Sequence, residues 1–349
     1  MVAQTLNERE QLILQAVVHL YITSAEPVGS RAIVKRLGLD ISPATVRNVM
    51  ADLEEMGYLE QRHTSSGRVP TDRGYRYYVD YLMRIQEITQ TEQTRIEQQL
   101  NERLTDAESV LRQTSYLLGL ISHQTSIVEA PRANVAELRR VELIPIAERR
   151  LAFLLADNYG GVRTVVLAME RALTGEETQR LSRFLNEHLH GTPIDTLSDS
   201  LQEKLQHFVD EQRTLASQAL ELVRLMPAPD SGKLFLEGTT QLFEQPEFKN
   251  VDKAREVFGL LEEHDRVVEL LRAGVVNAEP HSSRVVIGSE ARHHPFDELS
   301  LVSAPYKVGE TTVGMVGVLG PRRMPYSKLA GLVEFTASRL GNLLSRLAR

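Results

Sequence analysis

Arg47 and Asn48 carry side chains that suit the edges of nucleic-acid bases, and they lie in the first turns of a predicted helix. An arginine guanidinium pairs with two acceptors of guanine, and an asparagine amide pairs with adenine in the same bidentate way. The helix is predicted to begin at Ser42-Pro43, because serine is a strong N-cap and proline is favoured at the first helical position. The candidate base-reading residues are Ser42, Ala44, Thr45, Arg47 and Asn48.

An apolar stripe determines which face of this helix points outward. Gly57 ends the helix, and the stripe consists of Val46, Val49, Met50, Leu53 and Met56. Helical periodicity turns these side chains toward a core. The candidate base-reading residues are therefore left on the exposed face of the first turns.

Two further helices are predicted before this one. Asn7 and Glu10 form a capping-box pattern at the start of the first helix, and residues 27–29 end it. Ser30 precedes a short second helix that stops at Gly38. Three helices with a tight turn before the third are typical of a helix-turn-helix, whose second helix meets base edges at its N-terminal end. The sequence therefore predicts a DNA-binding domain, and leaves open which side chains reach bases and which reach phosphates.

A basic β-hairpin, or wing, is predicted after the third helix. Residues 58–61 and 68–71 form its strands around a small polar turn, and Pro70 fits an edge strand. The stretch 62–76 holds four arginines against one aspartate, a local charge of +3 in a chain whose net charge is −7. DNA responds to the face that it meets, so the local charge favours binding. We assign phosphate or minor-groove contacts to Arg31, Arg62, His63, Ser65 and Arg68.

The tyrosines that follow the wing, at positions 75, 77, 78 and 81, are predicted to pack in a core rather than to stack on bases.

Composition excludes other classes of protein. The chain has no apolar run of about 18 residues, so no transmembrane helix is predicted. Met1–Thr5 lack the regions of a signal peptide, and the absence of cysteine excludes disulfides and thiolate metal sites. We therefore expect a cytoplasmic protein, and its 349 residues should form two or three domains.

The rest of the chain is predicted to be an α/β region interrupted by helices. Residues 85–121 carry one polar helical pattern, either continuous or broken, and β-type runs follow at 141–146, 151–156 and 162–168. Helical patterns then extend to residue 273, and strands resume at Arg284. Strands on both sides of a helical block indicate an α/β domain with a helical insertion. The predicted class is an α+β multidomain protein.

No residue pattern indicates catalysis, so we predict no enzyme, no cofactor and no metal site. The glycines at 309, 314, 317 and 320 lack the spacing of a phosphate-binding loop, and we interpret them as a strand that its neighbours approach closely. The histidines at 188, 190, 293 and 294 are not accompanied by ligands at metal-binding spacing. Asp297-Glu298 has no proton-transfer partner that the sequence identifies.

Several strings of residues resemble the HrcA heat-inducible transcription repressors. In the N-terminal part these are Glu26–Arg31, Ser42–Asn48, Ala51–Leu59, His63–Asp72 and Gly74–Asp80. The wing string is the most specific. Less specific matches extend the resemblance over essentially the whole chain, at Gln245–Phe248, Ile287–Glu290, Ala304–Tyr306 and Gly317–Pro321. Val49 departs from the family pattern, which has glutamate there in many members.

The resemblance implies three parts. These are an N-terminal winged helix-turn-helix domain (1–84), a GAF-like α/β domain with a long connecting helix (85–196 and 282–349) and an inserted, mainly helical dimerisation domain (197–281). It also implies a homodimer that binds an inverted-repeat operator in double-stranded DNA upstream of chaperone operons. Heat would release repression, and a chaperonin would help to maintain the active repressor.

The residues themselves leave alternatives open. The chain could be a ligand-responsive regulator that senses a small molecule through the GAF-like domain, since fold alone does not fix function. It could also be an enzyme or a scaffold with a vestigial DNA-binding domain, or use its winged helix for protein contacts only. Arg47 could pair with Glu54 on the protein surface and so not reach DNA.

Overall fold

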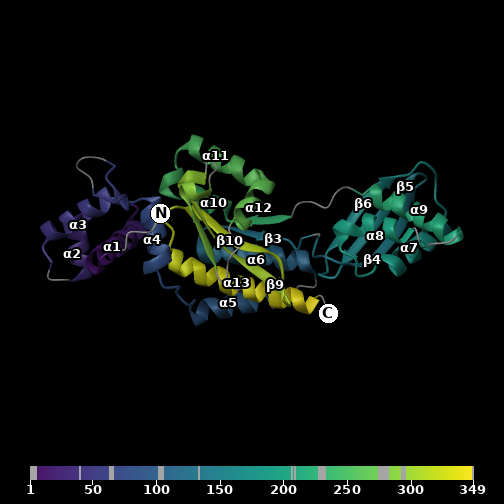
Figure 1. The fold of residues 1–349 in the computed structure, drawn as a ribbon, viewed down its shortest axis with the longest axis horizontal. Helices are drawn as coiled ribbons and strands as arrows, with labels where there is room; N and C mark the ends of the chain where they lie inside the picture. Colours follow the sequence, from purple (N-terminus) through teal and green to yellow (C-terminus); the bar gives the residue numbers. More distant parts are fainter. Residues whose placement is uncertain are drawn as a thin grey trace.

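The structure, a computed structural model, forms three parts that follow one another along its longest axis (Figure 1). A small helical part lies at one end, a mixed α/β part lies in the centre, and a lobe coloured teal lies at the other end. The structure describes residues 6–38, 41–62, 67–100, 106–132, 134–205, 207, 210–226, 233–273, 283–291 and 296–347.

The N-terminal part is the predicted winged helix. Asn7 and Glu10 form the capping box of the first helix, Gly38 ends the second in a left-handed conformation, and Ser42 caps the third. The first helix ends at Ser24, earlier than predicted, because Ala25 adopts the left-handed conformation that ends a helix. The elements are α1 (Glu8–Ser24), α2 (Ser30–Leu37), α3 (Pro43–Glu55), β1 (Leu59–Glu60), β2 (Val69–Pro70), α4 (Asp72–Tyr77) and the π-helical turn η1 (Tyr78–Leu82).

Tyrosines of α4 and η1 close the core of this part. Tyr75, Tyr77 and Tyr78 are buried, which confirms the predicted core packing, whereas Tyr81 is 63% exposed. Val49 of α3 is half-buried and packs against the same core. The residue that departs from the family pattern therefore borders the core rather than the outward face.

The predicted 85–121 helix is broken into two, and it begins later than predicted. Residues 83–89 are neither helix nor strand, α5 spans Gln90–Leu100, and α6 spans Ala107–Ser122. Asp106 starts α6 as a new helix, because its carboxylate accepts a hydrogen bond from the Ser109 amide at 2.8 Å.

The central part is built on an antiparallel sheet with the strand order β7-β3-β10-β9-β8. Helices α6 and α13 cover one face, and α10 to α12 lie on the other, as Figure 1 shows. The strands are β3 (Thr125–Glu129), β7 (Leu234–Glu237), β8 (Arg284–Ile287), β9 (Leu299–Val308) and β10 (Thr311–Pro321). The helical elements are α10 (Thr239–Phe243), η3 (Pro246–Phe248), α11 (Val251–Glu262), α12 (His264–Arg272), η5 (Gly288–Ala291), η6 (Phe296–Glu298) and α13 (Tyr326–Leu347).

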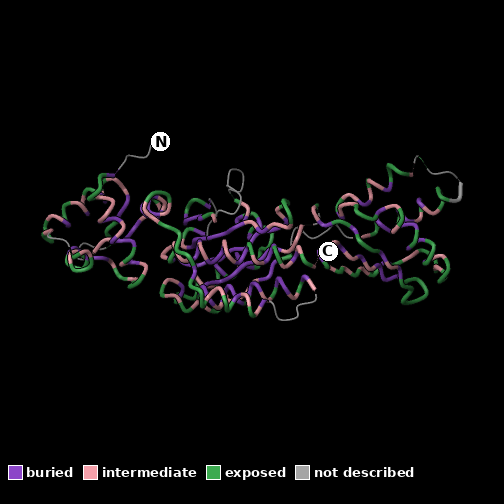
Figure 2. Tube along the Cα trace, turned by 90° about the horizontal axis from the view of Figure 1, so that it is seen from below, coloured by how far each residue is buried: buried purple, intermediate pink, exposed green. Residues whose placement is uncertain are grey.

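Alternate residues of these strands fill two separate apolar cores. Val285, Val302 and Val316 face α6 and α13, whereas Val286 and Leu301 belong to the cluster around α11 and α12. Figure 2 shows the buried positions concentrated along the strands of this part. A sheet covered on both faces forms a rigid support for elements that pack against its edges.

Gly314, Gly317 and Gly320 lie in the central strand β10, as predicted, whereas Gly309 lies in the turn before it with a φ of +61°. A Cβ atom at Gly314 would lie 2.5 Å from the Tyr306 hydroxyl oxygen, and one at Gly317 would lie 2.9 Å from Leu271. These glycines therefore allow close packing of neighbouring side chains and do not form a phosphate loop.

The teal lobe has its own three-stranded antiparallel sheet, in the order β4-β5-β6, with helices on one face. Its edge strand β4 is covered by α7, since the amides of Val141 and Leu143 donate to the side chains of Asn186 and Ser182. Its elements are β4 (Leu138–Ala147), β5 (Arg150–Asp157), β6 (Val162–Ala168), α7 (Gly175–Leu189), η2 (Ile194–Thr196), α8 (Leu197–Leu205) and α9 (Asp210–Arg224).

Strand pairing groups these elements differently from the predicted division at residues 196 and 197. The β4–β6 hairpins were expected in the main α/β domain, but they pair only with one another. Conversely, residues 234–237 were expected to be helical and part of the insertion, but they form strand β7, which pairs with β3 of the central sheet. A β-type run does not reveal the partner of its strand, and the short run at 234–237 was not recognised as a strand, so the change from strands to helices was a poor guide to the boundary. In the described part of the chain, no helix is long and apolar enough to cross a membrane.

Candidate nucleic-acid interface

The N-terminal end of α3 presents the outward face that the sequence predicts. Ser42, Ala44, Arg47 and Asn48 are exposed, and Thr45 is half-buried. The Ser42 hydroxyl accepts a hydrogen bond from the Thr45 amide at 3.1 Å and lies 2.9 Å from the Thr45 hydroxyl. These two hydroxyl groups therefore cap the helix, and Arg47 and Asn48 are the longer polar side chains that project from it.

Arg47 has no ion pair or side-chain hydrogen bond within the described residues, and the same holds for Asn48. Glu54, the carboxylate that Arg47 could have used on the surface, is bonded to Arg68 instead. An exposed guanidinium without a carboxylate partner keeps its full charge for an anionic ligand. The alternative Arg47–Glu54 pair is therefore not formed.

The charge along the outward face of α3 changes sign. Arg47 lies near the N-terminus of the helix, where the helix dipole is also positive, whereas Asp52 and Glu55 are exposed near its C-terminus. Carboxylates repel DNA phosphates. The charge pattern therefore limits contact with DNA to about the first two turns of the helix.

Helix α2 adds two exposed cations next to this surface. Arg31 and Lys35 are four residues apart, which places them on one face of the helix. Neither side chain is bonded to a carboxylate in the part of the chain that the structure describes. Lys35 is absent from the predicted set, although its spacing from Arg31 was a signal in the sequence that pointed to it.

The two wing arginines, Arg62 and Arg68, differ in their exposure and in their ion pairing. Arg68 Nε donates to Glu54 at 2.7 Å with only 16% of its side chain exposed, and its backbone pairs with Val28. Arg62 lies 3.5 Å from Glu60, and both side chains are about half exposed. Arg68 therefore ties the wing to α3, and Arg62 is the more accessible of the two. His63 and Ser65 lie outside the described residues.

The remaining arginines of the 62–76 stretch are also engaged. Arg73 donates to the Met56 carbonyl oxygen at 2.9 Å and lies over the ring of Tyr58, and Arg76 pairs with Glu290. The charges of Arg68 and Arg76 are thus balanced inside the protein, whereas Arg73 is exposed and has no carboxylate partner among the described residues. The accessible positive charge comes from α2, α3, Arg62 and Arg73, and sequence alone missed the two balanced charges because Glu54 and Glu290 are remote along the chain.

The histidines and carboxylates singled out in the sequence do not form a second candidate site among the described residues. No group of three metal-ligating side chains occurs among the described residues. The pair His293-His294 lies outside them, and Glu298, of the carboxylate pair at 297–298, bonds to Lys253 at 3.0 Å. The exposed face of α2 and α3 is therefore the candidate site.

Comparisons with known proteins match both the N-terminal part and the rest of the chain to one family. Residues 5–80 match a family described as winged helix-turn-helix transcription repressor, HrcA DNA-binding, and residues 108–330 match the HrcA protein C-terminal domain. The chain is similar to the heat-inducible transcription repressor HrcA of Geobacter sulfurreducens, at 40% identity over 97% of this chain and 98% of the relative. It is also similar to that of Moorella thermoacetica, at 37% identity over 99% of each chain.

One solved structure has the same fold over nearly the full length. It is described as a hypothetical protein, and it is 23% identical to this chain, with a TM-score of 0.63 and coverage of 98% of this chain and 100% of that one. This likeness concerns the fold alone.

Proposed function

The chain belongs to the HrcA family of heat-inducible transcription repressors, which are not enzymes, and from that premise we propose that it binds an inverted-repeat operator as a homodimer and represses chaperone operons. The observation that carries the proposal is the free N-terminal face of α3, where Arg47 and Asn48 are exposed and unpaired among the described residues. Two such helices, related by a two-fold axis, would read the two halves of a palindromic site.

Each predicted contact has a distinct role in this proposal. Arg47 and Asn48 would contact base edges, while the hydroxyl groups of Ser42 and Thr45 and the small side chain of Ala44 allow close approach of the helix to the groove. Arg31 and Arg62 would contact phosphates, together with His63 and Ser65 of the wing turn. Arg68 would act mainly by holding the wing against α3.

The open face of the β4–β6 sheet supports a dimer. Ile144, Val162 and Val166 are between 45% and 66% exposed, and Ile144 and Val166 lie on either side of Ala152 in register. An exposed apolar face on a sheet whose other face is packed is typical of a protein interface. We infer that the teal lobe is the inserted dimerisation domain, extending from after β3 to before β7, and that the central part is the GAF-like domain.

Release on heating is the finer part of the proposal. A repressor of marginal stability needs only about 1–2 kcal/mol of destabilisation to change its active population several-fold. A chaperonin that refolds the free repressor would then couple the level of repression to the demand for chaperones. Affinity that stays constant across the heat-shock range, with and without chaperonin, would overturn this part.

A second candidate, a ligand-responsive regulator, is favoured by one cavity. A space of about 1110 Å³ lies between the teal lobe and the central part, and the rings of Phe153, Tyr159 and Phe235 line it. A small molecule bound there would raise the unfolding temperature by mass action. Thermal-shift measurements with metabolite fractions test this candidate, and it fails if no fraction stabilises the protein.

A mobility-shift titration tests the main proposal. The labelled DNA is an inverted repeat from a chaperone promoter, the control is the same bases scrambled, and salt is held fixed because phosphate contacts depend strongly on it. We expect a preference for the repeat of at least about 1000-fold, the lower end for specific DNA-binding proteins. Equal binding to both fragments, with and without chaperonin, would contradict the proposal.

A substitution on the sheet face tests the dimer. Val166→Lys places a charge at the centre of the open face, whereas Gln179→Lys, at an exposed position of α7 on the covered side of the sheet, serves as the control. We expect sedimentation to show a monomer for Val166→Lys only, with a loss of affinity for the full repeat. A Val166→Lys protein that remains dimeric would exclude this face as the interface.

A further inference from the structure

The winged helix is joined to the central part by ion pairs rather than by a loose linker. Asp72 of α4 accepts a hydrogen bond from Arg322 at 2.8 Å, and Nε of Arg76 donates to Glu290 at 2.7 Å. Asp72 and Arg76 are four residues apart on one face of α4, and their partners lie at the end of β10 and in η5. We call these two pairs the joint.

The carboxylate of Asp72 is fully used by the central part. One oxygen accepts from Arg322, and the other accepts from the amide and the hydroxyl of Ser289 at 3.0 and 2.8 Å. Gly288 has a φ of +48°, and a Cβ atom there would lie 2.5 Å from this carboxylate. The glycine therefore provides the space that lets η5 close over Asp72.

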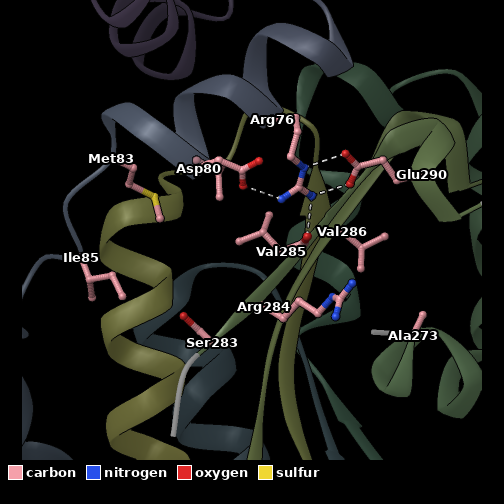
Figure 3. A pocket seen from close by; sticks show the side chains of 11 residues that line it. Arg76, Asp80, Met83, Ile85, Ala273, Ser283, Arg284, Val285, Val286 and Glu290 are labelled. Atoms are coloured by element: carbon pink, nitrogen blue, oxygen red, sulfur yellow. Dashed lines mark hydrogen bonds and ion pairs between the residues drawn. The ribbon is translucent and has the colours of Figure 1, made fainter. Parts of the chain in front are cut away.

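Arg76 holds the edge of the central sheet. Figure 3 shows its guanidinium between Glu290 and the carbonyl oxygen of Val285, to which Nη2 donates at 2.6 Å, while Nη1 reaches Asp80 at 3.2 Å. Val285 belongs to β8, the last strand of the sheet order. Arg76 thus binds a carbonyl oxygen of the outermost strand of the described sheet, and so fixes α4 against the sheet edge.

The segment after η1 is also held. The amide of Gln86 donates to the Ser327 carbonyl oxygen at 3.0 Å, and a Cβ atom at Gly331 would lie 2.2 Å from the Gln86 carbonyl oxygen. Next to Arg76, however, an open cavity of about 820 Å³ lies beside the joint, and Val79, Met83 and Val286 are among the residues that line it (Figure 3). Away from this cavity, the buried ring of Tyr75 on α4 packs edge-on against that of Tyr326 on α13, with their centres 5.8 Å apart. The polar contacts of the joint therefore act together with this ring contact in setting the orientation of α4.

We propose that Asp72 and Arg76 are positioning residues for DNA binding: through Arg322 and Glu290 they set the orientation of α3 relative to the central part. The consequence for DNA rests on the proposed function, since in a dimer the orientation of each α3 sets the distance between the two reading helices. Half-site spacing must match that distance. A winged helix released from the joint still reads one half-site but loses its selection of spacing.

Charge reversal tests the proposal. Arg76→Glu breaks the pair with Glu290, and Glu290→Arg breaks it from the other side. The double variant restores this ion pair with the charges exchanged, but not the hydrogen bonds from residue 76 to Val285 and Asp80. Arg266→Glu is the matched control, because Arg266 forms an exposed pair with Glu263 inside the central part. Each variant is titrated with a single half-site and with inverted repeats whose spacers differ by one base pair.

We expect the single reversals to leave half-site affinity within about twofold and to lower the preference for the best spacer by about tenfold. The double variant should recover much of the preference, because it restores the ion pair alone, and Arg266→Glu should resemble the parent. Recovery separates positioning from a general loss of structure. The proposal is overturned if Arg76→Glu keeps the parental spacer preference, or if it weakens the half-site and the full repeat equally.

A distance measurement tests the joint without DNA. The chain has no cysteine, so Asp52→Cys on α3 and Glu256→Cys on α11 accept spin labels at these two positions only, both of them exposed. Labelled chain diluted with unlabelled chain should give one narrow distance distribution, which broadens with Arg76→Glu and narrows again in the double variant. If the distance distribution is as narrow in Arg76→Glu as in the parent, the proposal about the joint is refuted. If the distribution broadens but the parent protein shows no preference for inverted-repeat DNA, only the proposed function is refuted.

Discussion

Two groups of arginines on the winged helix differ in what surrounds them. Arg31 and Arg47, on α2 and α3, are exposed and have no carboxylate partner in the described part of the chain. Arg73 and Arg76, on α4, are bonded to carbonyl oxygens, and Arg76 is also bonded to two carboxylates. The residue type is the same, but the guanidinium groups of the second group already donate hydrogen bonds within the protein and the charge of Arg76 is balanced there, whereas those of the first group are available to an external anion.

The comparison shows that the role of an arginine depends on the groups around its side chain and not on the net charge of the segment that contains it. Removing an exposed, unpaired arginine leaves nothing buried without a partner, so the fold should tolerate its loss. Removing one member of a half-buried pair leaves the other charge without its partner and only partly accessible to water, which lowers the free energy of unfolding. Substitutions in the first group should therefore weaken contacts with DNA without changing stability, whereas substitutions of Arg76 and of its partners in the joint should lower stability and, through the joint, the selection of half-site spacing.

The largest expected effect is on base reading. Replacing Arg47 and Asn48 with alanine should reduce operator affinity by about 100-fold or more, since each bidentate base contact contributes about 1–3 kcal/mol of discrimination. The unfolding midpoint should stay within about 2 °C, because neither side chain has a partner among the described residues. Fluorescence anisotropy with operator DNA measures the affinity.

Asp52→Ala, on the same helix but nearer its C-terminus, is the control and should not weaken binding. If the double alanine variant binds the operator as tightly as the parent, α3 does not read the DNA. The contrast between the two arginine groups would then lose its functional meaning.

The next largest effect concerns stability. Asp72→Ala removes a carboxylate that accepts hydrogen bonds from Arg322 and Ser289, and hydrogen bonds to charged groups contribute about 1.5–3 kcal/mol each before exposure is considered. Because both side chains of the pair are about one-fifth exposed, we expect a loss of about 2 kcal/mol in the free energy of unfolding. Urea denaturation of Asp72→Ala and Asp52→Ala should separate the two, and equal stability would show that the joint is not stabilising.

The winged helix could be predicted from sequence in some detail because its signals are local. Asn7 with Glu10, Gly38 and Ser42 each act within one turn of the chain, and all three are observed at the predicted places. The glycines of β10 were likewise interpreted correctly as close approach.

Contacts between remote residues could not be predicted in this way. Arg68 and Arg76 were counted as free charge because Glu54 and Glu290, which neutralise them, come next to them only in the folded chain. For the same reason β7 was assigned to the insertion, since no local pattern shows that it pairs with β3. Sequence thus located the reading helix, but it could not distinguish a DNA-binding arginine from one that joins two parts of the protein.

A smaller effect should appear in the salt dependence of binding. Arg31→Ala removes a single phosphate contact in our proposal, so the slope of log affinity against log salt should fall by about 1. Arg68→Ala should leave the slope nearly unchanged, because Arg68 is paired with Glu54. Titrations at four or more salt concentrations measure the slopes, and equal changes in both variants would contradict the assigned roles.

The smallest effect near neutral pH should come from the titration of Asp72. Burial acts to raise the pKa of this carboxyl, but hydrogen bonds from Arg322 and Ser289 outweigh it, so the pKa lies below its usual value of 3.8. A carboxyl with a lowered pKa stabilises the fold fully above its unfolded-state pKa, and this contribution is lost as the pH falls through the folded-state value. The stability difference between the parent and Asp72→Asn should therefore stay constant from about pH 7 to about pH 5 and shrink only in stronger acid. A difference that shrank already between these two values would mean that Asp72 is not held ionised by the joint, and that this carboxylate behaves like the exposed groups on α3.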